Sequence, residues 1–181
     1  GVHNRRPHDV SEAVPSHAAV AVGILELGLG DRALLALERR DRGLAVRRLR
    51  DELDALNAEH GVALLWEAHS ILSFVPRFVS APLPDLNVGT AGGTTCARAM
   101  QDAVMAVAEE SGYSCVLNGR FQGGFTTRHY GRPTDGIHAI QLELSQRTYM
   151  AEDGSHRFRE DLAQRVRPVL RRLLEAFLRA R

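Results

Sequence analysis

A short apolar run at residues 62–66, Val-Ala-Leu-Leu-Trp, constrains the fold of this chain more than any other feature. A continuous run of this kind is typical of a strand that is covered on both faces of a sheet. Glu67, His69 and Ser70 follow it within four residues. Open α/β sheets bind their ligands at the carboxyl ends of the strands. The stretch therefore predicts a buried strand whose end carries an acid, an imidazole and a hydroxyl.

Two later segments repeat this pattern of a strand followed by polar residues. Residues 113–117 predict a second strand, and Asn118 and Arg120 come directly after it. Residues 137–144 predict a third strand, in which a period of two sorts the side chains onto opposite faces. One face holds Ile140, Leu142 and Leu144, and the other holds Gln141 and Glu143.

Helical patterns separate these strands. Apolar residues recur at helical spacing before Gly61, before Gly112 and at residues 161–181, where Pro168 is expected to kink the helix or mark its start. The order helix, strand, helix, strand, strand, helix predicts a layered α/β domain. Two segments rich in glycine or proline, residues 71–96 and 121–135, are expected to be loops near the site.

The first 43 residues show no comparable pattern. Residues 1–15 are expected to form a loop or arm, and residues 18–40 are compatible with a helix despite three glycines. We therefore expect one domain at residues 44–181, preceded by an unassigned arm at residues 1–43.

Composition excludes several classes of protein. Among 181 residues, 44% are hydrophobic and 25% are charged, which disfavours disorder and a membrane protein. The net charge of +1, with arginines interleaved among acids, disfavours a nucleic-acid partner. Without a membrane-length apolar run or a signal-peptide pattern, the chain is expected to be cytoplasmic. Cys96 and Cys115 lack metal-type spacing and are interpreted as reduced thiols.

His69 and Glu67 have two interpretations each. A histidine at a strand end can bind zinc through its neutral imidazole, or it can close a turn by a hydrogen bond to Ser70. Glu67 can be the hydrogen-bond partner of such a ligand or simply a charge at the strand end, and the pattern alone favours the second interpretation.

Glu143 is the best candidate for a general base. A carboxylate between Leu142 and Leu144 is expected to be partly desolvated, which raises its pKa and suits it to accept a proton from water. The alternative is a structural acid paired with a nearby arginine.

Three arginines in the loops after the second strand are candidates for binding an acid: Arg120, Arg128 and Arg132. The planar guanidinium group matches a carboxylate in bidentate fashion, so such a set suits an acidic small molecule. The alternative is that they are solvated surface groups. His129 and Tyr130 could bind an oxyanion or pack the loop.

Five sequence blocks in a fixed order carry a family resemblance. They are LWEAHS at 65–70, LPDLNVGT at 83–90, LNGRFQGG at 117–124, TRHYG at 127–131 and QLEL at 141–144. Together they resemble the C-terminal part of the N-formylglutamate amidohydrolases, also called N-formylglutamate deformylases. The resemblance covers residues 45–181.

The resemblance implies a three-layer αβα sandwich around a mixed sheet, similar to the zinc carboxypeptidases and to phosphorylase/hydrolase-like folds. It also implies a zinc-dependent enzyme of histidine breakdown that cleaves N-formyl-L-glutamate into formate and glutamate. His69 corresponds to a metal ligand and Glu143 to the glutamate that activates water. Four residues correspond to substrate-binding positions: Arg120, Arg128, Asn118 and Asn87.

The N-terminal motifs of the family are not recognisable in residues 1–43. His8 and Glu12 are the nearest substitutes for the further zinc ligands that the family supplies there. The chain thus resembles a truncated member, and missing strands would expose a sheet edge for self-association. Three hypotheses stay open: an active formylglutamate hydrolase, an inactive remnant that binds small acids or a partner, and a related hydrolase acting on another acyl amino acid.

Overall fold

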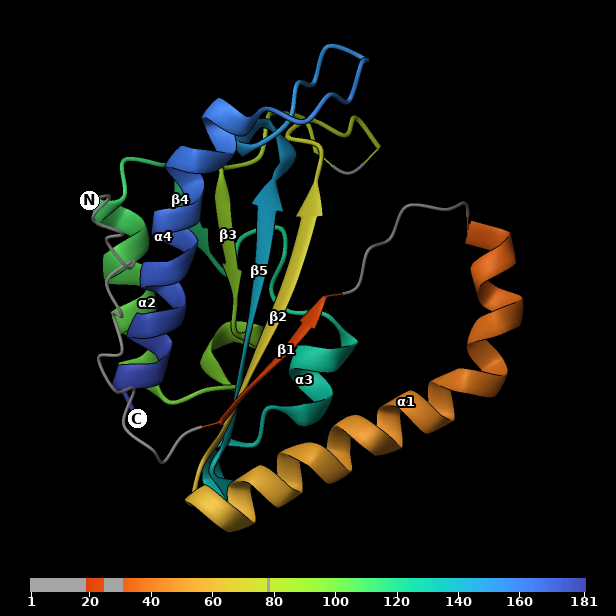
Figure 1. The fold of residues 1–181 in the computed structure, drawn as a ribbon, viewed down its shortest axis with the longest axis vertical. Helices are drawn as coiled ribbons and strands as arrows, with labels where there is room; N and C mark the ends of the chain where they lie inside the picture. The colour runs from red at the N-terminus through yellow and green to blue at the C-terminus, as the bar shows by residue number, and fades with distance from the viewer. Residues whose placement is uncertain (1–18, 25–30, 78) are drawn as a thin grey trace, which may run out of the picture.

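A five-stranded mixed sheet forms the centre of the molecule (Figure 1). The structure is a computed structural model that describes residues 19–24, 31–77 and 79–181, with side chains from residue 46 onward except residue 78. The strands are β1 (Ala19–Ile24), β2 (Ala63–Ile71), β3 (Leu86–Gly89), β4 (Cys115–Leu117) and β5 (Ile137–Ser145). Their spatial order is β1-β2-β5-β3-β4, and only the β3–β5 pair is antiparallel.

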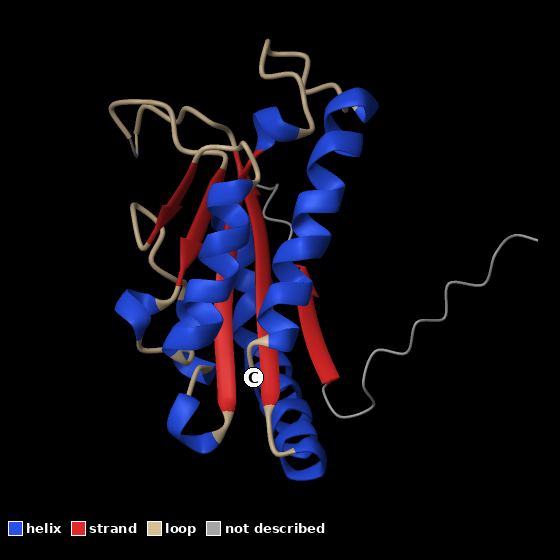
Figure 2. Ribbon diagram, turned by 90° about the vertical axis from the view of Figure 1, so that its left-hand side faces the viewer, coloured by secondary structure: helices blue, strands red, loops and turns tan. Residues whose placement is uncertain are grey.

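Helices cover both faces of this sheet. They are α1 (Asp31–His60), α2 (Arg98–Glu110), α3 (Phe125–Tyr130) and α4 (Glu160–Arg179), with short 3-10 turns at Ala91–Gly93, Pro133–Asp135 and Gln146–Thr148. Helices α2 and α4 lie side by side on one face (Figures 1 and 2). Helix α3 and the last turns of α1 pack on the other face. None of the described helices is long and apolar enough to cross a membrane.

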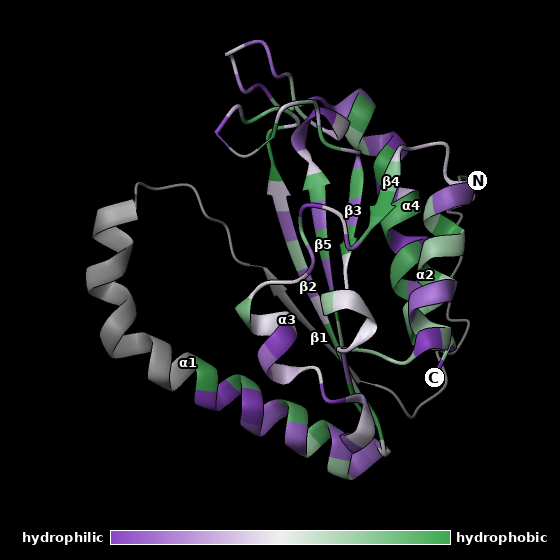
Figure 3. Cartoon of the chain, turned by 180° about the vertical axis from the view of Figure 1, so that it is seen from behind, coloured by the Kyte–Doolittle hydropathy of each residue, from purple (hydrophilic) through white to green (hydrophobic). Residues whose placement is uncertain are grey.

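The alternation of side chains along the strands builds two separate cores. Trp66 and Ile140 face α2 and α4, and the Trp66 ring lies 5.9 Å from that of Phe177 between ring centroids. Leu65 and Ala139 face the opposite side, where Leu53 of α1 packs on them. The described part of α1 alternates apolar and polar surfaces, as its colouring by hydropathy shows (Figure 3). The predicted two-residue period of the third strand is confirmed.

Two segments that were expected to be loops contain regular structure. Strand β3 lies inside residues 71–96, with Leu86 and Val88 fully buried between β5 and β4. Helix α3 lies inside residues 121–135. Both elements are too short to give a clear periodic pattern, and both depend on partners that are distant in sequence.

Strand β2 is longer than predicted, since it continues to Ile71. Glu67 and His69 therefore lie within the strand rather than beyond its end. The reason is that β5 also continues to Ser145 and pairs with β2 along its full length. Polar residues can occupy a strand interior when partner strands supply the backbone hydrogen bonds.

The N-terminal region also differs from the prediction. Residues 19–24 form β1, parallel to β2, instead of the first turns of a helix. Helix α1 begins at Asp31, so the expected boundary at residue 43 falls inside a helix. The expected arm at residues 1–15, with His8 and Glu12, lies outside the described residues.

The closing helix starts at Glu160, one residue from its predicted start, and Pro168 lies inside it. The expectation that Pro168 marks the start of the helix is wrong. A buried stripe on α4, from Val166 to Phe177, anchors the helix on both sides of the proline against the sheet. This packing outweighs the lost backbone hydrogen bond.

Candidate active site

The register of the sheet places His69 beside Glu143. The two residues are Cα partners across the parallel β2–β5 pair, and Glu67 is the partner of Gln141. All four side chains point to the α3 side of the sheet, because their neighbours Ala68 and Leu142 pack with the core on the opposite side. The candidate site thus lies on a sheet face rather than beyond the strand ends.

Glu67 is a buried partner of His69, not a loose charge at a strand end. It is only 8% exposed, and its Oε1 lies 3.1 Å from His69 Nε2. Its other oxygen, Oε2, accepts hydrogen bonds from the backbone N of Thr127, at 3.0 Å, and from the Thr127 hydroxyl. Helix α3 thereby fixes the carboxylate, which in turn orients the imidazole.

These contacts change the pKa values of both groups. Burial by itself raises the pKa of Glu67, but the hydrogen bonds from His69, Thr127 and Thr126 outweigh it and the pKa is lowered. The hydrogen bond to Glu67 raises the pKa of His69 against the opposing effect of burial, and the nearby Glu143 carboxylate adds to the rise. The pair therefore favours an ionised glutamate beside a protonated imidazole.

Glu143 has the opposite perturbation. It is 8% exposed, and burial raises its pKa to about 7, although the positive charge of His69 opposes the rise. No hydrogen bond to its carboxylate is present among the described side chains. Glu67 and Glu143 are thus two carboxylates on one face whose environments push their pKa values apart, a pattern characteristic of acid and base roles.

A pocket of about 310 Å³ opens beside this cluster. Its lining consists of Arg120, Phe121, Gln122, Gly123, Gly124, Arg128 and Gln141. Neither arginine has a carboxylate partner among the described residues: Arg120 makes no hydrogen bond there, and Arg128 donates only to the carbonyl of Gly123. The lining contains no acid, so the pocket is positively charged and suited to an anion.

The pocket wall is held close to the sheet by glycine. A Cβ on Gly89, at the end of β3, would lie 2.6 Å from Gly123 N. The backbone of residues 121–124 can therefore approach β3 only because Gly89 has no side chain. Ala91 N also donates to the Gln122 carbonyl, which fixes the same wall.

The two predicted asparagines lie near the site but outside the pocket lining. Asn118 bonds Thr90 twice: its Oδ1 accepts from Thr90 N at 2.8 Å, and its Nδ2 donates to Thr90 Oγ1 at 2.9 Å. Asn87 is 1% exposed and its Nδ2 donates to the carbonyls of Pro84 and Glu143. Both side chains hold strand ends in place.

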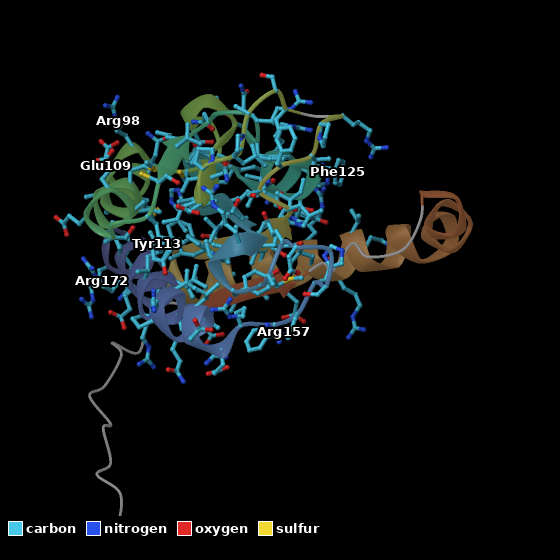
Figure 4. All side chains as sticks on the ribbon, turned by 90° about the horizontal axis from the view of Figure 1, so that it is seen from above. Arg98, Glu109, Tyr113, Phe125, Arg157 and Arg172 are labelled. Carbon is cyan, nitrogen blue, oxygen red and sulfur yellow. The ribbon has the colours of Figure 1, made fainter. Side chains whose placement is uncertain are left out.

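Three other candidates are occupied by protein contacts. Arg132 pairs with Asp54 at 2.8 Å and with Asp135 at 3.4 Å. Tyr130 donates to the carbonyl of Val46. His129 lies 2.6 Å from Arg50 and stacks on Phe125, which is exposed at the molecular surface (Figure 4). His129 and Tyr130 join α3 to α1, Arg132 joins the segment after α3 to α1, and none of the three lines the pocket.

Sequence reasoning missed Thr127 and Gln141. Thr127 could not be found, because its role depends on a short helix that only the tertiary fold creates. Gln141 had a usable signal: it shares the polar face of its strand with Glu143, two residues away.

The described residues do not complete a zinc site. A catalytic zinc has three protein ligands, and the described part of the chain holds no group of three His, Cys, Asp or Glu side chains that could bind a metal. His69 is present with its carboxylate partner, the arrangement by which many proteins orient a metal-binding histidine. A single histidine with one carboxylate neighbour does not supply the three protein ligands of a catalytic zinc.

The fold and the site define an α/β protein with a partly buried histidine between two buried carboxylates, beside a pocket lined by arginines. Residues 46–150 match the family model of N-formylglutamate amidohydrolase. The chain belongs to the N-formylglutamate amidohydrolase family.

Individual relatives agree with this membership. An N-formylglutamate deformylase of Pseudomonas putida is 53% identical over 131 residues, which is 72% of this chain and 49% of the relative. The deformylase of Pseudomonas aeruginosa PAO1 is 53% identical over 135 residues, covering 73% and 50%. The chain therefore spans about half the length of the curated relatives it matches.

A solved structure shows the same fold. The crystal structure of N-formylglutamate amidohydrolase from Ralstonia eutropha JMP134 superposes with a TM-score of 0.64 at 24% identity. The match covers 81% of this chain and 54% of that one. The likeness supports a mixed α/β sheet with helices of this family.

Proposed function

We propose that this chain acts in the hydrolysis of N-formyl-L-glutamate to formate and L-glutamate, with Glu143 as the general base. The observation that carries the proposal is the raised pKa of Glu143, buried beside the ordered Glu67–His69 pair. The names of the relatives supply the substrate. The reaction belongs to histidine breakdown, as the family resemblance implies.

Glu143 has the properties that amide hydrolysis requires. A carboxyl group with a pKa of about 7 is present in both protonation states near neutral pH. As the carboxylate it takes a proton from the water that attacks the formyl carbon. As the acid it returns that proton to the amine nitrogen when the C–N bond breaks. The products are then formate and free glutamate.

Arg120 and Arg128 suit the acidic part of the substrate. Guanidinium groups bind carboxylates through paired hydrogen bonds, and these two have no competing acid within the described residues. We assign Asn118 and Asn87 a supporting role instead, because both amide atoms of Asn118 and the Nδ2 of Asn87 make hydrogen bonds to the protein. They keep the ends of β3 and β4 in place around the pocket.

The zinc expected of the family is not part of the proposed steps, because the described residues do not form its site. His69 remains our candidate for one ligand, and a bound zinc ion would polarise the formyl carbonyl and acidify water. We also propose that the helices on both sheet faces form the carboxypeptidase-like three-layer sandwich.

A second candidate function is binding of small acids without catalysis. This function is favoured because the described residues include the pocket and its arginines but no group of three side chains that could bind a metal. A related hydrolase acting on another N-acyl amino acid is the third candidate, since the pocket recognises charge and not the acyl group.

A formate-release assay separates these functions. Purified chain is incubated with N-formyl-L-glutamate and with N-acetyl-L-glutamate, with and without added zinc, after its metal content has been measured. We expect formate from the formyl substrate in the zinc-supplemented sample and loss of at least about 100-fold in kcat for Glu143→Gln. Glu109→Gln, on the exposed side of α2, is the matched control and should keep full activity.

No formate release with added zinc would contradict the hydrolase proposal for this chain. Binding of L-glutamate without turnover would then favour the acid-binding function. Faster cleavage of the acetyl substrate than of the formyl substrate would favour the related hydrolase.

A further inference from the structure

Gln141 occupies the middle of the candidate site. It lies on β5 two residues before Glu143 and on the same face, with Glu67 and Gly89 as its Cα partners on either side. Its side chain is 5% exposed, and it lines the pocket together with Arg120 and Arg128. Gln141 therefore belongs both to the pocket lining and to the strand face that carries Glu143.

The orientation of its carboxamide follows from one hydrogen bond. Gly124 N donates to Gln141 Oε1 at 2.5 Å. Since a backbone N–H needs an acceptor, this contact assigns the oxygen to the loop side and the nitrogen to the other side. Gln141 therefore offers its Nε2 group, with two hydrogens, away from Gly124.

That nitrogen has no acceptor within residues 46–77 and 79–181. The two glutamates on the same face accept no hydrogen bond from Gln141: Glu67 is bonded by Thr127 and lies against His69, and no hydrogen bond between Gln141 and Glu143 is present. Gln141 Nε2 is not one of the fully buried side-chain atoms that lack a partner, so it is open to the pocket that Gln141 lines. A ligand oxygen in the pocket can therefore accept a hydrogen bond from it in place of water.

We propose that Gln141 Nε2 donates a hydrogen bond to a carboxylate oxygen of the bound acyl amino acid, between the arginines and Glu143. The identity of the acid rests on the proposed function. Every charged side chain of the pocket lining is an arginine, so a carboxylate is the chemical group that satisfies the arginines and the amide together. Gln141 is then a specificity-determining residue that sets the distance between the acid and the base.

Two variants distinguish this role from mere support of the loop. Gln141→Glu keeps an oxygen that can accept from Gly124 N, but it replaces the donor with a second acceptor. Gln141→Met removes both groups. If Gln141 binds the acid, Gln141→Glu weakens the binding of L-glutamate at pH 8 by at least about tenfold, and more than Gln141→Met does. If Gln141 only holds the loop, Gln141→Met, which loses the acceptor for Gly124 N, weakens binding at least as much as Gln141→Glu, and that order would overturn the proposal.

Binding is measured by calorimetry with L-glutamate as the probe, so that no turnover is needed. Gln164→Glu, on the exposed side of α4, adds the same charge far from the pocket and is expected to leave the affinity unchanged. Circular dichroism verifies that each variant is folded. Equal affinity losses in Gln164→Glu and Gln141→Glu would assign the effect to net charge and overturn the proposal.

The role of Gln141 can also be tested on the wild-type chain, so that the result does not depend on whether a variant folds. The side-chain amide of Gln141 gives a pair of NMR signals, which are assigned by triple-resonance experiments on the wild-type chain. We expect these signals to shift on titration with L-glutamate, and an absent shift at saturation would overturn the proposal. Binding with this shift but without formate release would contradict only the hydrolase function. Formate release with unchanged Gln141→Glu affinity would contradict only the role of Gln141.

Discussion

His69 and Glu143 are direct neighbours across the β2–β5 pair, although 74 positions separate them in the chain. Burial is the main cause of the raised pKa of Glu143, and the positive charge of His69 moderates it. For His69, the hydrogen bond to Glu67 is the main cause of the raised pKa, with a smaller contribution from Glu143. One strand pairing therefore joins three titrating groups into a single electrostatic unit.

The first prediction concerns stability against pH. The pKa of Glu143 is about 7 in the folded chain, whereas the ordinary value, which applies to the unfolded chain, is 4.5. Between these two pH values the folded chain therefore keeps a proton on Glu143 that the unfolded chain has lost. The free energy of unfolding therefore falls as pH rises from 4.5 to about 7, and the loss is complete above that. Glu143→Gln lacks this loss and should be more stable than wild type at pH 8 by about 1–3 kcal/mol.

Urea unfolding at a series of pH values, with a chelator present, measures this difference. Near pH 4.5 the two proteins should differ least. The control Glu109→Gln should follow the wild-type profile. If the free energy of unfolding of Glu143→Gln had the same pH dependence as that of the wild type, burial would not raise the pKa of Glu143.

The second prediction concerns the coupling of Glu67 to His69. Since the hydrogen bond to Glu67 is the largest cause of the raised pKa of His69, Glu67→Gln should lower that pKa towards or below 6.5. In the wild type, this pair stabilises the folded state below pH 6.5, and the contribution is lost as pH rises through the folded pKa. NMR titration of the imidazole protons in metal-free protein measures the change. Glu59→Gln, at the exposed end of α1, serves as control, and an unchanged His69 titration would contradict the coupling.

The third prediction concerns the arginines of the pocket. Arg120 is exposed and makes no ion pair with the described residues, so Arg120→Gln should change the free energy of unfolding by less than about 0.5 kcal/mol. The same change should weaken L-glutamate binding at least about tenfold, because a carboxylate loses its bidentate partner. Calorimetry compares it with Arg98→Gln, whose partner Asp102 lies on α2. Equal affinities of both variants would exclude Arg120 from the binding site.

The fourth prediction concerns the close approach at Gly89. A methyl group there would lie 2.6 Å from Gly123 N and 2.7 Å from the Gln122 carbonyl carbon, so the pocket wall must move. Gly89→Ala should lower the free energy of unfolding by about 2 kcal/mol or more and weaken acid binding. Gly61→Ala is the control, because Gly61 has a φ of +73° but no atom within 4 Å of the added methyl. Gly61→Ala should lower the free energy of unfolding only by the backbone strain, about 1 kcal/mol, and should leave acid binding unchanged.

Much of the fold could be predicted from local patterns. The apolar run before Glu67 and the two-residue period around Glu143 are strand signals that depend only on neighbouring residues. The amphipathic pattern of the closing helix was equally clear, although packing of Val166 and Phe177 decided how Pro168 is tolerated. Short elements such as β3 and α3 escaped prediction because their stability comes from contacts with distant segments.

The sequence by itself determined the chemical types at the site: a glutamate and a histidine after one apolar run, a glutamate within a later strand, and arginines in loops near glycines. Only the tertiary structure decided which of them act together. The register of β2 against β5 brings His69 to Glu143, and α3 turns Glu67 from a strand-end charge into the anchor of His69. Pairing register and burial depend on contacts between remote segments, and the pKa values of these groups follow from those contacts.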